Sequence, residues 1–475
     1  MLIPPTLQYK SSDFVVSQPN WRPPNNFQFA VPAGCKDWRI FLLKGQRDSL
    51  TTQDAARFGE DYVKRCRERG MQIGAPNAVE LIDPPPADKS PDYQSRLKMR
   101  EAASAGCQFV LFISSDFSTI HKHIKLEERL SRVITQDLKL KTVTSFMQKS
   151  QMLALDNIIY KTNLKLGGMN YGLSLKNAIP NYNPFPPNRL IIGITINQAP
   201  EVPNIHFNGE RLPPPSVVGF CTNMANFPTE YIGDFIYQDT KKEDLILSTV
   251  EMWDKILDRF MGLLDSEGNK IAGEPKRPIP NEVILYRQGI KEGCYGACLT
   301  EEIPLLKAYL DQKRKGVRIT YINVQKDHSV RLMPTVFNAA EKATLQNIGS
   351  GTVVDDQITH PRFKEFFLNS HITLQGTART PRYTVLYDDK KLTMNELEII
   401  TYALAYNFQI VNSPVSIPAP LYVANRYAER GVDLYTSKQS DEMATSNQKI
   451  RVTIPQMNED LTYCNTPLGK MRVNA

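Results

Sequence analysis

Short runs of apolar residues alternate with helical segments in the first third of the chain. Residues 38–43 (WRIFLL) and 108–113 (QFVLFI) each indicate a buried strand. Each run is followed by a segment with helical character, residues 52–69 and 118–132. Because strands that alternate with helices form parallel sheets, this part of the chain predicts an α/β domain.

The second half of the chain shows a different order of elements. Residues 190–197 (LIIGITIN) alternate, with apolar side chains on one face and Gly193, Thr195 and Asn197 on the other. Further strands are expected at 217–221 and 231–237, followed by a helix at 244–264 and a strand at 283–286. Three successive strands, a helix and another strand resemble the mixed sheet of the ribonuclease H type. Later strands are expected at 318–324 and 383–387.

Three helix ends can be located from capping residues. A long helix over residues 145–165 is expected to stop at the Gly167-Gly168 pair. Thr393 and Glu396 have the spacing of a capping box, which predicts a helix start. Near the C-terminus, a helix that follows residues 416–420 is expected to end at Arg430-Gly431.

Proline divides the chain, with 33 residues among 475. Residues 177–188 (NAIPNYNPFPPN) carry four prolines and show no periodicity, which makes them the best domain boundary. Residues 1–34 have little periodicity and are expected to form a linker. The predicted division is therefore 1–34, 35–178 and 179–475, in agreement with the two or three units that this length suggests.

The composition is that of an ordinary globular protein with a mild positive charge. The net charge of +7 permits nucleic acid or phosphate as a partner without requiring either. The chain shows neither a secretory signal nor an apolar stretch long enough to span a bilayer, so we expect an intracellular, unanchored protein. Seven scattered cysteines predict reduced thiols, and the Cys294/Cys298 pair has no partner pair at zinc-site spacing.

Several cations recur at helical spacing. His121 and Lys125 are four residues apart on one expected helix, and Lys161 and Lys165 are four apart on another. With the amide of Gln136 between them in sequence, they could hold a phosphate through charge-assisted hydrogen bonds. Lysines in a last helical turn can also simply complement the helix dipole. Tyr422, Arg426 and Arg430 form a third stripe, suited to phosphate and base contact or to a solvated face.

With these residues in view, the sequence resembles the MID and PIWI domains of the Argonaute family. The matching stretches occur in the family's order: residues 161–170 (KTNLKLGGMN), 286–293 (YRQGIKEG), 324–331 (VQKDHSVR), 351–361 (GTVVDDQITHP), 370–379 (SHITLQGTAR) and 415–420 (VSIPAP). The resemblance implies a Rossmann-like MID domain over 35–178, followed by a ribonuclease H-like PIWI domain over 179–475. The family's N-terminal and PAZ domains have no counterpart here, which leaves open whether the chain is a fragment or a short member.

The resemblance also implies a binding pocket for the 5′ phosphate of a guide RNA. The matching residues are His121, Lys125, Gln136, Lys161, Lys165 and, from the PIWI side, Arg430. Where the family pattern has a tyrosine, this chain has His121, which is smaller and can carry a charge. This substitution resembles the worm-specific Argonaute branch, whose guides carry 5′ triphosphates. No cofactor is required, although Mg²⁺ at the guide 5′ phosphate is compatible with the pattern.

Contacts with the guide backbone are expected from the PIWI domain, and the resemblance implies further partners. The backbone residues are Lys326, Arg331, Arg379, Ser416 and Tyr422, of which the three cations could equally form salt bridges. The expected partners are a small guide RNA, a complementary target RNA and silencing-effector proteins. The resemblance implies a monomer without membrane contact that acts in the cytoplasm, the nucleus or ribonucleoprotein granules.

Target cleavage is a separate expectation. A ribonuclease H type nuclease needs clustered carboxylates to hold two Mg²⁺ ions. At the family's four catalytic positions this chain has Thr195, Glu243, Gln288 and Asn425, so only one acid is present. Neutral side chains cannot supply the charge that strips water from Mg²⁺. The resemblance therefore implies RNA-guided silencing without slicing.

Two alternatives are open. A displaced metal site could be completed by other acids, for which the candidates are Asp355, Asp356, Asp388 and Asp389. The chain could also be a decayed domain that keeps the fold for protein contacts only. The presence of Lys125, Gln136, Lys161 and Arg430 argues against decay, because a protein that binds no phosphate has no physical reason to keep this set.

Overall fold

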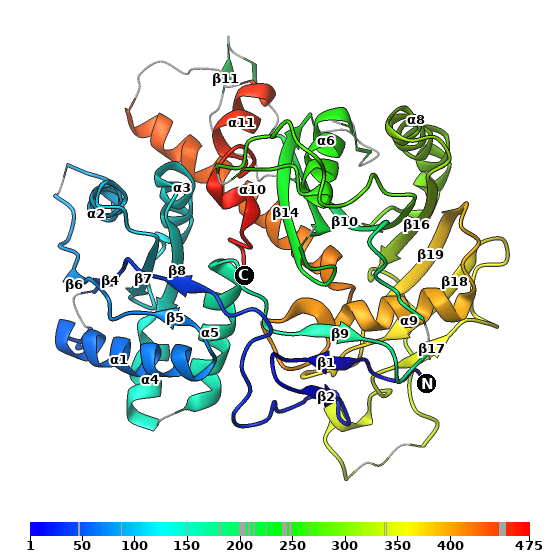
Figure 1. Ribbon diagram of the computed structural model, residues 1–475, viewed down its shortest axis with the longest axis horizontal. Helices are drawn as coiled ribbons and strands as arrows, with labels where there is room; N and C mark the ends of the chain where they lie inside the picture. The colour runs from blue at the N-terminus through cyan, green and yellow to red at the C-terminus, as the bar shows by residue number, and fades with distance from the viewer. Residues whose placement is uncertain are drawn as a thin grey trace.

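The computed structural model contains two α/β units and a small sheet that joins them (Figure 1). It describes all residues except 46–47, 87, 150, 180–181, 199–205, 208–209, 212–213, 225, 240–244, 247–248, 266, 337, 339 and 446–452. None of the described helices is both long and apolar enough to cross a membrane.

The first unit is a parallel sheet covered by helices on both faces. Its strand order is β6-β4-β7-β8, with β6 at Ala78–Leu81, β4 at Trp38–Leu43, β7 at Phe109–Ser114 and β8 at Ile134–Lys139. One face packs on α2 (Tyr93–Ser104) and α3 (His121–Ser131). The other face packs on α1 (Thr52–Glu68), α4 (Leu140–Lys149) and α5 (Met152–Lys165). The expected parallel α/β domain is confirmed.

The second unit is built on an eight-stranded mixed sheet. The strand order is β14 (Tyr231–Gln238), β13 (Ser216–Asn223), β10 (Arg189–Gln198), β15 (Glu282–Gln288), β16 (Arg318–Gln325), β19 (Arg382–Asp388), β18 (Lys364–Asn369) and β17 (Thr352–Val354). The strands β10, β15 and β16 run parallel, whereas their neighbours pair antiparallel.

Helices cover both faces of this sheet too. One face packs on α6 (Thr249–Met261) and α8 (Ile303–Lys313). The other packs on α9 (Met394–Ala405) and α10 (Ala419–Thr445). The capping box that starts α9 is present, since the Glu396 amide donates to Thr393 Oγ1 at 3.2 Å and the Thr393 amide donates to Glu396 Oε2 at 2.9 Å.

The helix expected over residues 145–165 is in fact two helices, α4 and α5. Gln151, just before α5, has a ψ of 81° that is not helical. Phe146 and Leu155 both pack in the main core. Nine residues apart on one straight helix, they would point to opposite sides at 100° per residue. The break lets both apolar faces reach the same core.

The C-terminal helix does not end at Gly431, as the sequence suggested, but continues to Thr445. A Cβ atom on Gly431 would lie 2.5 Å from Val217 Cγ1 and 2.7 Å from Phe235 Cδ2. The glycine therefore lets α10 lie close to the sheet, and it is a packing residue and not a helix stop.

Residues 1–34 are more ordered than a linker. Strands β1 (Thr6–Gln8) and β2 (Asp13–Val15) form a small sheet with β9 (Gly172–Ser174). Trp21 stacks on Tyr406 of the second unit, with ring centroids 5.5 Å apart. One continuous apolar core runs through this segment and both units, so the two units are held as neighbours.

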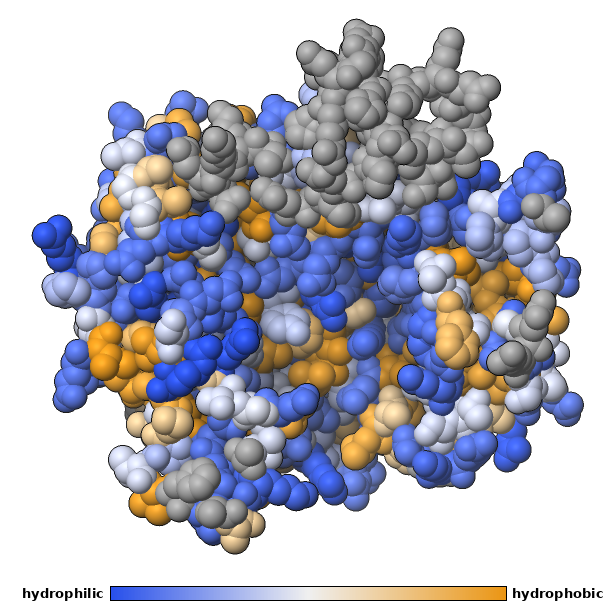
Figure 2. All heavy atoms as spheres, turned by 180° about the vertical axis from the view of Figure 1, so that it is seen from behind, coloured by the Kyte–Doolittle hydropathy of each residue, from blue (hydrophilic) through white to orange (hydrophobic). Residues whose placement is uncertain are grey.

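Viewed from behind, the surface is mostly hydrophilic, and its exposed apolar residues form scattered groups (Figure 2).

Candidate functional site

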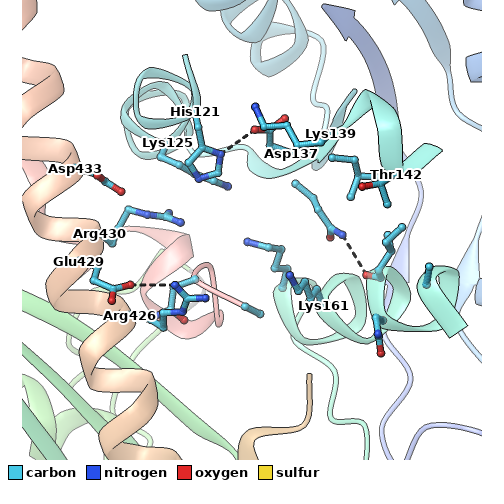
Figure 3. A pocket seen from close by; sticks show the side chains of 18 residues that line it. His121, Lys125, Asp137, Lys139, Thr142, Lys161, Arg426, Glu429, Arg430 and Asp433 are labelled. Carbon is cyan, nitrogen blue, oxygen red and sulfur yellow. Dashed lines mark hydrogen bonds and ion pairs between the residues drawn. The ribbon is translucent and has the colours of Figure 1, made fainter. Parts of the chain in front are cut away.

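A cavity of about 530 Å³ lies where α3, β8 and α5 of the first unit meet α10 of the second (Figure 3). We call it the α3–α10 pocket. It is lined by His121, Lys125, Gln136, Asp137, Leu138, Lys139, Thr142, Ala154, Asn157, Ile158, Lys161, Lys165, Arg426, Glu429, Arg430, Asp433, Asn474 and Ala475. All six residues that the sequence predicted for phosphate binding are in this set.

The fold explains why residues so far apart in sequence meet here. His121 is the first residue of α3 and Lys125 is one turn further on, so both side chains lie on the same side of the helix. Lys161 and Lys165 repeat this spacing on α5, and Lys161 lies across the pocket from Arg430 on α10 (Figure 3). Gln136 lies on β8 between them.

Four of the six side chains form a buried inner layer. Gln136 is 3% exposed, and its amide nitrogen donates to the carbonyl oxygen of Ile158 at 3.1 Å. The Lys125 ammonium donates to Glu128 Oε2 at 2.9 Å, and Arg430 donates to Glu128 Oε1 at 3.1 Å. Lys165 donates to the carbonyl oxygen of Val473. This layer is held in place by protein contacts before any ligand is present.

The outer layer is open to solvent. The side chain of His121 is 49% exposed, and its Nδ1 lies 2.9 Å from Asp137 Oδ2. Lys161 is exposed, and its ammonium makes no hydrogen bond to any residue in the described part of the chain. Arg426 is half exposed and pairs with Glu429 at 3.0 Å. A ligand that enters the pocket would meet His121, Lys161 and Arg426 first.

The positive charges in the pocket are costly to hold. Burial, the neighbouring Lys125 and Arg430 lower the pKa of the Lys165 ammonium well below its usual range, although Glu128 opposes this. Burial also lowers the pKa of Lys125. An anion placed among these groups would relieve the mutual repulsion of the cations, so the pocket is suited to a phosphate.

Sequence reasoning missed the acids of this pocket. Glu128 is three residues after Lys125, a spacing at which helical side chains meet, so its contact with Lys125 could have been expected. Asp137 and Asp433 carry no such signal, because their positions depend on how β8 and α10 are packed. Arg426 was recognised as part of a helical stripe but not as a pocket residue.

A second cavity of about 440 Å³ lies in the second unit at the ends of β15 and β16. We call it the Gln288 pocket. It is lined by Gln288, Gly289, Lys291, Val324, Gln325, Lys326, Asp327 and Arg379. Two residues predicted for guide-backbone binding, Lys326 and Arg379, are therefore together, and Lys326 donates to a third, Ser416, at 2.9 Å.

Arg331 and Tyr422 do not line either of these two cavities. Arg331 donates to the carbonyl oxygen of His328 at 2.7 Å. The Tyr422 ring packs on Phe408, with centroids 4.4 Å apart. Their predicted contact with a guide backbone stays a prediction.

Three of the four degenerate catalytic positions converge beside the Gln288 pocket. Ile194 of β10 pairs with Arg287 of β15, so Thr195 and Gln288 occupy the next register positions. The amide nitrogen of Asn425, on α10, donates to Gln288 Oε1 at 2.5 Å. The fourth position, Glu243, lies outside the described residues. The three described side chains at these positions are neutral, and two of them are joined by this hydrogen bond.

The acids considered for a displaced metal site are not gathered around a common point. Asp388 accepts hydrogen bonds from Thr320 at 3.0 Å and from Lys364 at 3.1 Å. Asp389 accepts from Lys307 at 3.2 Å, whereas Asp355 and Asp356 are exposed. Within the described part of the chain, no group of three or more His, Cys, Asp or Glu side chains could hold a metal ion.

Comparison with known sequences identifies relatives over most of the chain. A model of the Piwi domain matches residues 108–436. Argonaute protein wago-1 of Caenorhabditis elegans is 32% identical over 465 residues, which cover 96% of this chain and 45% of the relative. The chain thus spans less than half the length of this curated relative.

Two solved structures have the same fold. The C-terminal lobe of a budding yeast Argonaute superposes with a TM-score of 0.76 at 19% identity, and covers 100% of this chain and 94% of that one. Kluyveromyces polysporus Argonaute with a guide RNA gives a TM-score of 0.77 at 20% identity, and covers 99% of this chain and 56% of that one.

Proposed function

The chain belongs to the Argonaute/PIWI family, and we propose that it anchors the 5′ phosphate of a small guide RNA in the α3–α10 pocket. The observation that carries this proposal is the meeting of His121, Lys125, Gln136, Lys161, Lys165 and Arg430 around one cavity. A phosphate in that cavity would accept charge-assisted hydrogen bonds from the outer cations and would lie in the field of the inner ones.

The proposal extends to a guide that carries a 5′ triphosphate. The cavity of about 530 Å³ is also lined by His121, Lys139 and Thr142. His121 is half exposed at this side and can become positively charged. It would stabilise the outer phosphates, whereas a tyrosine ring at this position would mainly stack on the first base.

The guide would pair with a target RNA while its backbone rests on the second unit. Lys326 and Arg379 face the Gln288 pocket, and phosphate contacts of this kind position a strand without reading its sequence. Specificity would then come from base pairing. Silencing would depend on effector proteins recruited to the loaded complex, in the cytoplasm, the nucleus or ribonucleoprotein granules, with the chain acting as a monomer.

The proposed function does not include target cleavage. Thr195, Gln288 and Asn425 offer no negative charge, and Mg²⁺ is held in proteins chiefly by carboxylates and phosphate oxygens. A Mg²⁺ ion at the guide 5′ end is compatible with the pocket acids Glu429 and Asp433, with most of its ligands supplied by phosphates and water. No step of the proposal requires this ion.

The test compares three guides of one sequence that differ only at the 5′ end, as hydroxyl, monophosphate or triphosphate. Each carries a 3′ fluorophore, and binding to the purified chain is measured by anisotropy. We expect the hydroxyl guide to bind most weakly and the triphosphate guide most tightly. Equal affinity for all three would contradict anchoring, whereas equal affinity for monophosphate and triphosphate would remove only the triphosphate part.

The same complexes test the absence of slicing. A complementary target RNA is added with Mg²⁺, and the products are separated on a denaturing gel. We expect the target to remain intact. A cut at one fixed position opposite the guide would overturn this part of the proposal.

A further inference from the structure

A completely buried carboxylate, that of Glu128, is bonded to two of the cations that line the α3–α10 pocket. Glu128 is 0% exposed, and both of its oxygens accept hydrogen bonds. Oε2 accepts from Lys125 Nζ at 2.9 Å, from the Thr135 amide at 2.7 Å and from Thr135 Oγ1 at 2.6 Å. Oε1 accepts from Arg430 Nη1 at 3.1 Å. One carboxylate thus joins a cation of the first unit to a cation of the second.

The same contacts saturate the Lys125 ammonium. It donates to Glu128 Oε2, to the carbonyl oxygen of Thr135 at 2.9 Å and to Thr135 Oγ1 at 2.7 Å. An ammonium has three donors, and all three are used. As the pocket is built, Lys125 acts on a ligand through its charge and not through a free N–H group.

Cations from three elements surround Glu128. Lys125 lies on the same helix, Lys165 approaches from α5 and Arg430 from α10. Together they lower the pKa of the Glu128 carboxyl to about 2, even though burial by itself would raise it. Tyr463, from the segment that follows α11 (Ile454–Leu461), bonds to Arg430 at 3.1 Å. Asp137 on β8, Lys161 on α5 and Asp433 on α10 are further charged groups that act on these cations.

On the basis of the proposed function, we infer that Glu128 is a positioning residue for the guide 5′ phosphate, because it fixes Lys125 and Arg430 and favours the charged form of the buried cations while the pocket is empty. Three cations buried together without an anion would repel one another strongly in a medium of low dielectric constant. The carboxylate opposes this repulsion, since it attracts all three cations. The phosphate then meets charges that are already in place and need no reorganisation.

The inference predicts a proton-linked defect in a Glu128→Gln variant. Without the carboxylate, Lys125 or Lys165 is expected to lose its proton in the empty pocket, and a bound phosphate must restore it. Between pH 6.5 and 8.5 the variant should lose about 100-fold more affinity for a 5′-monophosphate guide than the wild type loses, because one extra proton taken up on binding changes the affinity about ten-fold per pH unit. Its affinity for the 5′-hydroxyl guide should equal that of the wild type.

The proton itself can be counted. Calorimetric titration of the chain with the 5′-monophosphate guide in two buffers of different ionisation enthalpy gives the number of protons bound. The Glu128→Gln variant should take up about one proton more than the wild type at pH 8. A purely structural role of Glu128 would not change this number.

Two further variants complete the design. Glu127→Gln is the matched control, because Glu127 is on the same helix and 2% exposed, but bonds to Arg100 at 3.0 Å and Ser131 at 2.7 Å, away from the pocket. It should behave as the wild type does. Glu128→Asp retains the negative charge and should therefore show the wild-type number of bound protons. It is the variant to measure if Glu128→Gln does not fold.

The outcomes separate this inference from the proposed function. If the wild type does not distinguish 5′-hydroxyl from 5′-phosphate guides, the proposed function fails. If the wild type does distinguish them but Glu128→Gln binds phosphate guides more tightly at every pH, Glu128 is only a repelling charge and the inference is wrong. An equal loss of affinity for hydroxyl and phosphate guides would also overturn the inference, since it would indicate general damage.

Discussion

The α3–α10 pocket and the Gln288 pocket differ in the charge of the buried side chains around them. The first has Lys125, Lys165 and Arg430 gathered around Glu128. The second has the hydrogen-bonded amides of Gln288 and Asn425, with cations such as Lys326 and Arg379 at its edge. The first site therefore combines several buried cations with one buried carboxylate, whereas the second combines neutral amides with cations and a single acid, Asp327.

The difference shows which ligands each site can accept. A phosphate is stabilised by positive charge and N–H donors, and the α3–α10 pocket provides both. A two-metal nuclease site needs several carboxylates to replace the water around Mg²⁺, and among the described residues that line the Gln288 pocket only Asp327 is an acid. Four predictions test this contrast.

The largest expected effect follows from removing a partner of the buried carboxylate. Lys125→Ala removes one of the two cations that hydrogen-bond to Glu128, and breaking a buried ion pair in this way costs about 3–5 kcal/mol. We expect the free energy of unfolding, measured in urea, to fall by this amount. Lys326→Ala is the control. Lys326 lines the Gln288 pocket and is only partly buried, so this variant should lower the free energy of unfolding far less.

The second prediction concerns affinity and not stability. Lys161 is exposed, so Lys161→Ala should leave the fold intact. It removes one charge-assisted phosphate contact, about 1.5–3 kcal/mol, which corresponds to a loss of roughly 10- to 150-fold in affinity for 5′-phosphate guides. Binding assays with the 5′-hydroxyl guide should show no change. A similar loss for both guides would place the 5′ end elsewhere.

The third prediction concerns a variant in which the neutral site becomes acidic. In a Gln288→Asp, Asn425→Asp variant, two carboxylates replace amides that are 2.5 Å apart. Their repulsion and the lost hydrogen bond should lower stability by about 1–3 kcal/mol, and Mg²⁺ should recover part of it. The melting temperature is measured with and without Mg²⁺. A variant as stable as the wild type, with no response to Mg²⁺, would show that the two positions do not form one site.

The smallest effect is expected from pH. Burial, with the nearby Lys326, lowers the pKa of the His371 imidazole to about 4, and its Nδ1 has no hydrogen-bond partner among the described residues. The unfolded chain therefore binds a proton at His371 at a higher pH than the folded one, so stability is present above about pH 6.5 and is lost as the pH falls toward 4.

A His371→Gln variant checks this assignment. Between pH 6.5 and 5.5 the wild type should lose up to about 1.4 kcal/mol more stability than the variant, as measured by urea unfolding. The Glu128 carboxyl, whose pKa is lowered to about 2, should lose its contribution only below about pH 4.5. Equal slopes in wild type and variant between pH 6.5 and 5.5 would show that His371 does not cause the loss.

Much of the fold could be predicted because it rests on local patterns. The strands at Trp38–Leu43 and Arg189–Gln198 follow from apolar runs and alternation, and the start of α9 follows from a capping box. The fold class, a Rossmann-like domain before a ribonuclease H-like domain, is confirmed by the two sheets and by the solved relatives. The errors at Gln151 and Gly431 arose where packing against a distant element decided the backbone, which no local pattern records.

The sequence by itself determined which charges are present: the cations of α3, α5 and α10, and the neutral residues at Thr195, Gln288 and Asn425. Only the tertiary structure decided how they are used. It buried Lys125 and Arg430 against Glu128 and left His121 and Lys161 open to solvent. Spacing along a helix fixes which side chains share a face, but burial and ion pairing depend on what packs against that face, and here the partners are about 300 residues apart.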